Sequence, residues 1–103
     1  READGLAKSS RNVYLDPSQR ITSLSLSQAL QHARQMVAAG ELSASSIIAK
    51  ATELIANSGA RVDYVSIVDA RNLQAQESIN DHSRMILAAY VGKTRLIDNM
   101  PLF

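Results

Sequence analysis

The sequence predicts an α+β fold, in which two helices pack on one face of a small three-stranded antiparallel sheet. Its first half holds two stretches whose apolar residues recur with the period of a helix, and a residue suited to begin a helix precedes each stretch. Its second half holds three shorter runs rich in apolar and β-branched residues, which are typical of strands. A two-residue link with glycine first joins the last two runs, as in a tight antiparallel hairpin.

The first helix is expected over residues 17–39. Asp16 can accept hydrogen bonds from the free amides of the first turn, Pro17 suits the first helical position, and Gln19 can reach back to the cap. Gly40 supplies the stop. One apolar stripe runs along this helix and consists of Leu26, Leu30, Ala33 and Val37.

The second helix is expected over residues 44–57, after Ser43 as the cap and before the helix-ending stretch Asn57-Ser58-Gly59. Its apolar stripe consists of Ile47, Ile48, Ala51, Leu54 and Ile55. Because each helix has one apolar face, both must pack against another element, and the strands that follow provide it.

The strands are expected over residues 62–68, 84–91 and 94–99, with the polar stretch 74–83 as a loop. The middle run is apolar on both faces, which indicates the central strand of the sheet. Gly92-Lys93 predicts a type II′ turn, because glycine readily adopts the positive φ angle that the first turn position requires.

Length, charge and composition exclude several classes of protein. A chain of 103 residues fits one domain, and 46% hydrophobic but only 4% aromatic residues predict a core of Leu, Ile, Val and Ala. A net charge of +1 gives no electrostatic basis for general nucleic-acid binding. The absence of cysteine excludes disulfides and thiolate sites and permits a reducing compartment, so a cytoplasmic location is expected.

Two further features concern the ends and runs of the chain. No uncharged apolar run approaches the roughly 20 residues that a membrane-spanning helix needs, so no membrane partner is expected. The sequence opens on Arg1-Glu2-Ala3-Asp4 rather than on methionine, and we therefore expect a piece of a longer protein.

The stretch Lys8-Ser9-Ser10-Arg11-Asn12 is the main candidate site. Two hydroxyls, a guanidinium fork and a lysine ammonium are groups that can hold a phosphate. A polar turn flanked by solvated cations explains the same residues, and the sequence pattern leaves both interpretations open. Residues 1–15 lie outside the helix and strand pattern, and we expect them to be ordered only where something packs against them.

The histidines and methionines favour structural roles. His32 lies beside the apolar stripe of the first helix and His82 lies in the polar loop, so both are expected at the surface. Without cysteine or acidic residues at ligand spacing, no metal site is predicted. Met36 and Met85 are expected to fill the core.

Two aspartates lie in or at the end of predicted strands. Asp69 and Asp98 are expected to accept hydrogen bonds from backbone amides or to pair with Arg71 or Arg95, rather than to act as a catalytic acid and base.

Several motifs resemble those of one enzyme family, the pantothenate synthetases (pantoate–β-alanine ligases). Residues 1–15, READGLAKSSRNVYL, closely resemble the family's signature, although Lys8 stands where the commonest form of that signature has Met. Further matches follow in order and cover nearly the whole chain. They are Val62-Asp63-Tyr64, Val68-Asp69-Ala70, Leu73 and Thr94-Arg95-Leu96-Ile97-Asp98-Asn99.

The resemblance implies the smaller C-terminal domain of a two-domain ligase whose larger nucleotide-binding domain comes first. The family uses ATP and Mg²⁺ to join pantoate to β-alanine, a step of the coenzyme A pathway. Pantoyl adenylate forms first with release of pyrophosphate, and the β-alanine amine then displaces AMP to give pantothenate. Magnesium would be bound mainly by the preceding domain. Family members resemble one another in forming homodimers, largely through that domain. This chain by itself can therefore exist as a monomer.

The resemblance also implies roles for particular residues. Residues 1–15 become a phosphate-contacting lead-in segment and residues 16–103 a lid domain. Ser9, Ser10, Arg11 and, with the least support, Lys8 would bind ATP, and Arg11 would serve catalysis. The isolated piece is expected to be inactive. The alternative is a non-catalytic α+β interaction module, in which the same stretch is a solvated linker.

Overall fold

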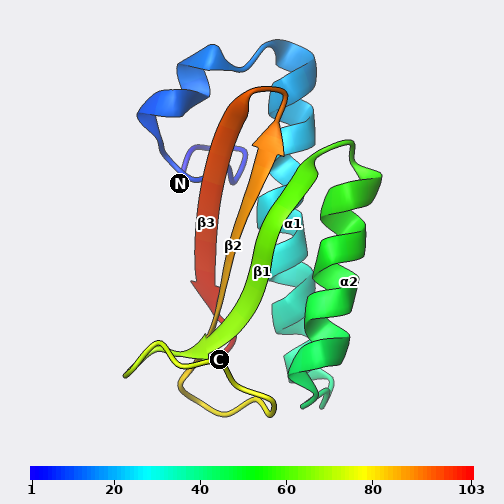
Figure 1. Ribbon diagram of the computed structural model, residues 1–103, viewed down its shortest axis with the longest axis vertical. Helices are drawn as coiled ribbons and strands as arrows, with labels where there is room; N and C mark the ends of the chain where they lie inside the picture. The colour runs from blue at the N-terminus through cyan, green and yellow to red at the C-terminus, as the bar shows by residue number, and fades with distance from the viewer.

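The computed structural model describes all residues from 1 to 103 and confirms the α+β fold. Two α-helices lie side by side against one face of a three-stranded antiparallel sheet (Figure 1). The elements in chain order are the 3-10 helix η1 (Ser10–Tyr14), α1 (Pro17–Ala38), α2 (Ala44–Asn57), β1 (Arg61–Asp69), β2 (Ser83–Val91) and β3 (Thr94–Pro101). Neither α-helix combines the length and the apolar character needed to cross a membrane.

Both helices begin at the predicted caps. Asp16 Oδ1 accepts from the Gln19 amide at 2.7 Å, and Gln19 Oε1 accepts from the Asp16 amide at 3.1 Å, which completes a capping box. Ser43 Oγ accepts from the Ser46 amide at the start of α2. The first helix ends at Ala38, one residue before the predicted end, and α2 matches its predicted bounds.

The sheet has the order β1-β2-β3, so the strand predicted to be central lies in the middle. β1 extends one residue beyond both predicted ends, β2 begins one residue early, and β3 ends two residues late, whereas the end of β2 and the start of β3 match the prediction. Val91 pairs with Thr94, which leaves Gly92 and Lys93 as the turn between β2 and β3. Gly92 has a φ of +59°, whereas Lys93 is not among the residues with positive φ, and this combination is that of the predicted type II′ turn.

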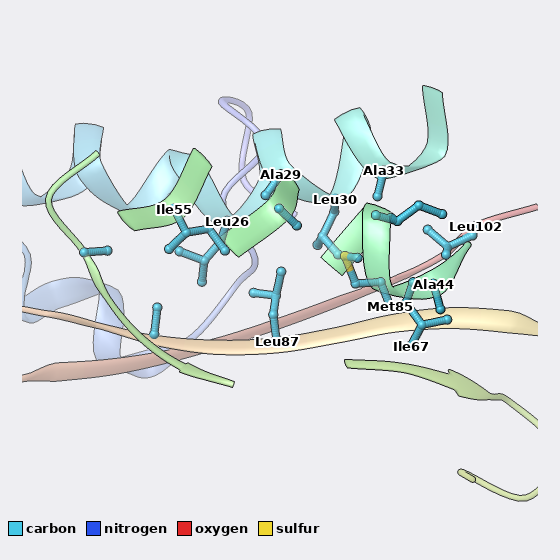
Figure 2. Packing of buried hydrophobic residues seen from close by; sticks show 14 of the residues in the cluster. Leu26, Ala29, Leu30, Ala33, Ala44, Ile55, Ile67, Met85, Leu87 and Leu102 are labelled. Carbon is cyan, nitrogen blue, oxygen red and sulfur yellow. The ribbon is translucent and has the colours of Figure 1, made fainter. Parts of the chain in front are cut away.

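The core lies between the sheet and the two helices (Figure 2). The predicted helix stripes supply its upper layer, and alternate residues of β2 supply the lower one, because successive strand side chains point to opposite faces. Met85 is fully buried and Met36 packs against the core, as expected. Other fully buried large side chains are Leu26, Leu30, Ile47, Ile55, Ile67 and Leu87.

The prediction for Asp69 is confirmed, and the prediction for Asp98 holds in part, because Asp98 Oδ1 accepts from the Asn99 backbone amide at 2.8 Å. Asp69 accepts from the Arg71 guanidinium at 2.7 Å and from the Arg71 backbone amide at 2.8 Å. Asp98 does not pair with Arg95, because the two residues are three apart on β3 and their side chains point to opposite faces of the sheet. Arg95 instead pairs with Asp63 at 2.9 Å.

Candidate functional site

The amino-terminal segment, residues 1–15, packs against the domain itself. It lies beside β3 and the start of α1 (Figure 1). Leu6 anchors it with a side chain only 3% exposed, and burial of a leucine is worth about 2 kcal/mol. A Cβ on Gly5 would lie 3.2 Å from Ser27 Oγ of α1, so the chain passes close to that helix. Residues 1–15 were expected to be ordered only where something packs against them, and α1 and β3 provide that surface.

Arg1 ties the beginning of this segment to β3. Its Nη1 and Nη2 donate to the two carboxylate oxygens of Asp98 at 2.7 and 2.8 Å, a bidentate pair. The Asp98 side chain is only 6% exposed, and Arg1 also donates to the backbone oxygens of Gly5 and Asn99. The hydrogen bond to Asp98 holds the pKa of the Arg1 guanidinium above its ordinary value. Arg1, rather than Arg95, is therefore the ion-pair partner of Asp98.

Arg20 ties the same segment to α1. Its guanidinium pairs with Asp4 at 2.9 Å and with Glu2 at 3.1 Å. Glu2 also accepts from the side-chain amide of Asn12, which in turn donates to the backbone oxygen of Ala7 at 3.0 Å. Hydrogen bonds from Arg20 are the main reason why the pKa values of Glu2 and Asp4 are lowered. The network connects both ends of the stretch that carries the candidate residues.

Lys8, Ser9 and Ser10 line one hollow of about 620 Å³, together with residues of the Arg20 network. Ser9 caps η1, since its Oγ accepts from the Arg11 amide at 3.1 Å. The Lys8 ammonium has no carboxylate within ion-pair distance and the Ser10 hydroxyl makes no hydrogen bond within the chain. The three predicted residues therefore present free donors on one side of the segment.

Arg11 lies on the other side of η1. Its Nη1 donates to the backbone oxygen of Arg95 at 3.1 Å, and it lines a second hollow of about 820 Å³ beside the β2–β3 hairpin. The separation follows from 3-10 geometry, in which residues three apart align and neighbours are rotated by about 120°. Ser10 and Val13 accordingly face the first hollow, whereas Arg11 and Tyr14 face the second. The sequence predicted one site formed by Lys8, Ser9, Ser10 and Arg11. In the structure the first three line one hollow and Arg11 lines the other.

The remaining candidates lie away from both hollows. His82 is exposed and 3.4 Å from Asp81, and His32 is half-buried on α1. No group of three or more His, Asp or Glu side chains is arranged to hold a metal ion. The residues of this chain therefore do not fit a magnesium site.

A family model described as pantoate-beta-alanine ligase matches residues 1–101. The chain belongs to the pantoate–β-alanine ligase family. Pantothenate synthetase from Heliobacterium modesticaldum is 50% identical over 97% of this chain and 36% of that protein. The enzyme of the same name from Moorella thermoacetica is 48% identical over 99% of this chain and 36% of that protein. The chain spans little more than a third of the length of these curated relatives.

Solved structures of the pantoate–β-alanine ligase family share the fold. Pantothenate synthetase from Thermus thermophilus aligns over 100% of this chain and 37% of its own, with a TM-score of 0.91 and 35% identity. The Francisella tularensis ligase aligns over 99% of this chain and 30% of its own, with a TM-score of 0.64 and 27% identity, and was solved with beta-gamma ATP and beta-alanine. The family's fold therefore extends over residues 1–15 as well as over the helices and sheet.

Sequence reasoning missed the residues that hold the ligase signature in place. Arg20 carried a weak signal, because it lies in the first turn of a predicted helix where a cation is not favoured unless it has partners. Asp98 carried another, since it faces the helices from a strand position where apolar residues are expected. Neither signal could name the partner residue, which lies far away in the sequence.

The ion pairs of Arg20 predict a pH-dependent contribution to stability. Glu2 and Asp4 have pKa values lowered from their ordinary values of 4.5 and 3.8. Their contribution is therefore fully present above those values and is lost as the pH falls through the lower folded-state values. We expect the difference in Tm between the unmodified chain and Arg20→Gln to be constant near neutral pH and to shrink below about pH 4. Thermal unfolding followed by circular dichroism across this range measures it.

A second acidic group provides an internal control for this measurement. Hydrogen bonds from Arg71 lower the pKa of Asp69 to about 2, so Asp69 also loses its contribution in strong acid. Because Asp69 is unchanged in both chains, its transition cancels in the Tm difference. A difference that is as large at about pH 2 as at neutral pH would contradict the assignment of the Arg20 pairs.

Proposed function

We propose that this chain is the C-terminal domain of a pantothenate synthetase and acts as a lid over a preceding nucleotide-binding domain. The full-length enzyme would condense pantoate with β-alanine at the expense of ATP, through pantoyl adenylate, giving pantothenate, AMP and pyrophosphate. The observation that carries this proposal is the family match over residues 1–101, which includes the whole signature. The Francisella tularensis relative, solved with beta-gamma ATP and beta-alanine, supports the choice of two of the substrates.

The signature residues would act on the phosphates during adenylate formation. The pantoate carboxylate attacks the α-phosphorus, the bond from that phosphorus to the bridging oxygen breaks, and pyrophosphate leaves with the electron pair. Negative charge develops on the phosphoryl and leaving-group oxygens, so donors that tighten there lower the barrier. Ser10 and Lys8 have donors without partners in the chain, and Ser9 holds the turn that presents them.

Arg11 would supply the strongest of these contacts. In the structure its guanidinium makes one exposed hydrogen bond to the Arg95 backbone oxygen, and such a bond is worth about 1 kcal/mol net. The long side chain can therefore exchange that carbonyl for a phosphate oxygen at small cost, with gain of a charge-assisted bond. Closure of the lid would bring this exchange about when nucleotide is bound.

The proposal leaves magnesium and most substrate contacts to the preceding domain. It also implies that the 103-residue chain by itself has no ligase activity. As for the family, the proposal includes a cytoplasmic enzyme that serves coenzyme A synthesis and dimerises largely through the preceding domain.

The test is Arg11→Ala in the full-length enzyme, with Arg34→Ala as the control. Arg34 is an exposed arginine of α1 without an ion pair, so its removal changes the charge equally but touches no phosphate contact. We expect Arg11→Ala to slow adenylate formation by about 10-fold or more, equivalent to roughly 1.4 kcal/mol of transition-state stabilisation. Rapid-quench measurement of pyrophosphate release, before β-alanine is added, isolates this step.

Two further results complete the test. The chain alone, mixed with pantoate, β-alanine, ATP and Mg²⁺, should form no pantothenate above a blank. An Arg11→Ala enzyme whose adenylation rate equals that of Arg34→Ala would instead favour the non-catalytic interaction module, in which residues 8–11 form a linker.

A further inference from the structure

The larger of the two hollows around η1 is a separate feature from the one lined by Lys8, Ser9 and Ser10. It lies between η1, the first turn of α1 and the β2–β3 hairpin, and has a volume of about 820 Å³. Only one of its lining residues is hydrophobic. The residues that line it are Arg11, Tyr14, Gln19, Gly92, Lys93, Thr94 and Arg95.

The charge of this hollow is entirely positive. Arg11, Lys93 and Arg95 line it and no carboxylate does. Neither Arg11 nor Lys93 has an acidic partner, and Arg95 pairs with Asp63, which holds its guanidinium in place. A chain with a net charge of only +1 therefore places two unpaired cations, Arg11 and Lys93, and the paired guanidinium of Arg95 around one concave surface. Such an arrangement attracts anions locally even though the whole molecule does not.

Neutral donors converge on the same hollow. The capping box fixes Gln19 Oε1 on the Asp16 amide, so the side-chain Nε2 points the other way, toward the hairpin. A Cβ on Gly92 would lie 2.7 Å from that Nε2, and only glycine lets the amide approach the turn so closely. The Thr94 hydroxyl also lines the hollow and makes no hydrogen bond within the chain. These donors have no acceptor in the chain.

The first hollow differs in its charge. It contains the Glu2 carboxylate, and of its two cations Arg20 is already paired with Glu2 and Asp4, which leaves Lys8 as its one unpaired cation. Exposed lysines are common on solvated surfaces and need no ligand to explain them. Solvation does not explain why the capping box of α1 holds the Gln19 amide donor close to Gly92. The donor set of the larger hollow is instead complementary to a compact anion with several oxygens.

We infer that the hollow formed by Arg11, Gln19, Lys93 and Thr94 is an anion subsite of the hairpin that takes a diphosphate group. Lys93 and Arg11 supply charge, and Gln19 and Thr94 supply neutral hydrogen bonds. Its place in the reaction rests on the proposed function, which releases pyrophosphate beside Arg11. The diphosphate is either free pyrophosphate or the terminal phosphates of ATP.

The experiment is a titration of the isotopically labelled 103-residue chain, whose core is closed by its own residues, with sodium pyrophosphate and separately with ATP. We expect saturable shifts of the backbone amides of residues 92–95 and Arg11. Shifts with pyrophosphate alone assign the subsite to the released product. Shifts with ATP that include Lys8, Ser9 and Ser10 assign it to the bound nucleotide, and both results support the subsite.

Two variants and one control make the assignment specific. Lys93→Gln should weaken pyrophosphate binding by about fivefold or more. Gln19→Glu keeps an oxygen that accepts from the Asp16 amide, so the helix cap survives while a carboxylate replaces the donor at the hairpin. It should abolish binding without lowering Tm. Lys50→Gln removes an exposed lysine of α2 and should leave the affinity unchanged.

The outcomes separate this inference from the proposed function. Absence of saturable shifts, shifts confined to residues 8–10, or an affinity that neither Lys93→Gln nor Gln19→Glu alters would each overturn the hairpin subsite. The proposed function is judged independently, by the rate of adenylate formation in the Arg11→Ala full-length enzyme.

Discussion

Leu87→Ala is expected to lower the free energy of unfolding of this chain by about 3 kcal/mol. Leu87 lies at the middle of the central strand β2, is fully buried, and points toward the helices, with Leu26 and Leu30 on either side of it in the view of Figure 2. The helices cover Leu87, and β1 and β3 flank its strand on the two edges. The surrounding side chains therefore cannot collapse into the space that the truncation leaves. The cost is therefore the lost transfer free energy together with the cavity.

Urea denaturation followed by circular dichroism measures this loss. Ile97→Ala is the matched control, because Ile97 is a β3 residue that pairs with Ala88 on the uncovered face of the sheet and is 58% exposed. Its truncation should cost no more than about 1 kcal/mol. Equal losses for the two variants would show that the core does not lie between β2 and the helices.

Asp98→Asn is expected to cost about 2 kcal/mol and to loosen residues 1–15. The substitution keeps the shape of the side chain but replaces one acceptor oxygen by a donor that faces the Arg1 guanidinium. A fully buried charge left unpaired would cost more, but the Arg1 side chain is 32% exposed and can turn toward water. Arg1 also donates to the backbone oxygen of Gly5, so displacement of the Arg1 side chain removes a contact within the segment that carries the ligase signature.

The measurement has two parts. Urea denaturation gives the change in stability, and amide hydrogen exchange of Leu6 and residues 10–14 reports on the segment alone. Asp63→Asn is the control, since its pair with Arg95 has side chains 38% and 39% exposed and should contribute less than about 1 kcal/mol. If Asp98→Asn and Asp63→Asn have the same effect on stability and on exchange, the Arg1 pair does not anchor the segment.

The sequence identified nearly all of the local structure. The capping box at Asp16, the cap at Ser43 and the type II′ turn at Gly92 depend on atoms only a few residues apart, and all three were predictable. The strands followed from alternation and the central strand from its two apolar faces. The fifteen-residue signature also indicated the family, which the match over residues 1–101 establishes.

The candidate site was predicted less completely. Lys8, Ser9 and Ser10 do line one hollow together, but Arg11 faces another, because the segment forms a 3-10 helix that no pattern had indicated. Asp98 accepts from a backbone amide as expected, but the alternative pairing with Arg95 was wrong, although strand alternation alone places those two side chains on opposite faces.

The amino-acid sequence by itself determined the helices, the strands, the hairpin and the family, because caps, turns and apolar periodicity act over short stretches of chain. Only the tertiary structure decided which surface holds residues 1–15 and which cations surround the hairpin hollow. Arg1 and Asp98 are 97 residues apart, and Gln19 meets Gly92, which is also far away in the sequence. Such pairs form only after the core has fixed the position of β3 against α1, and no local preference of either residue encodes the partner.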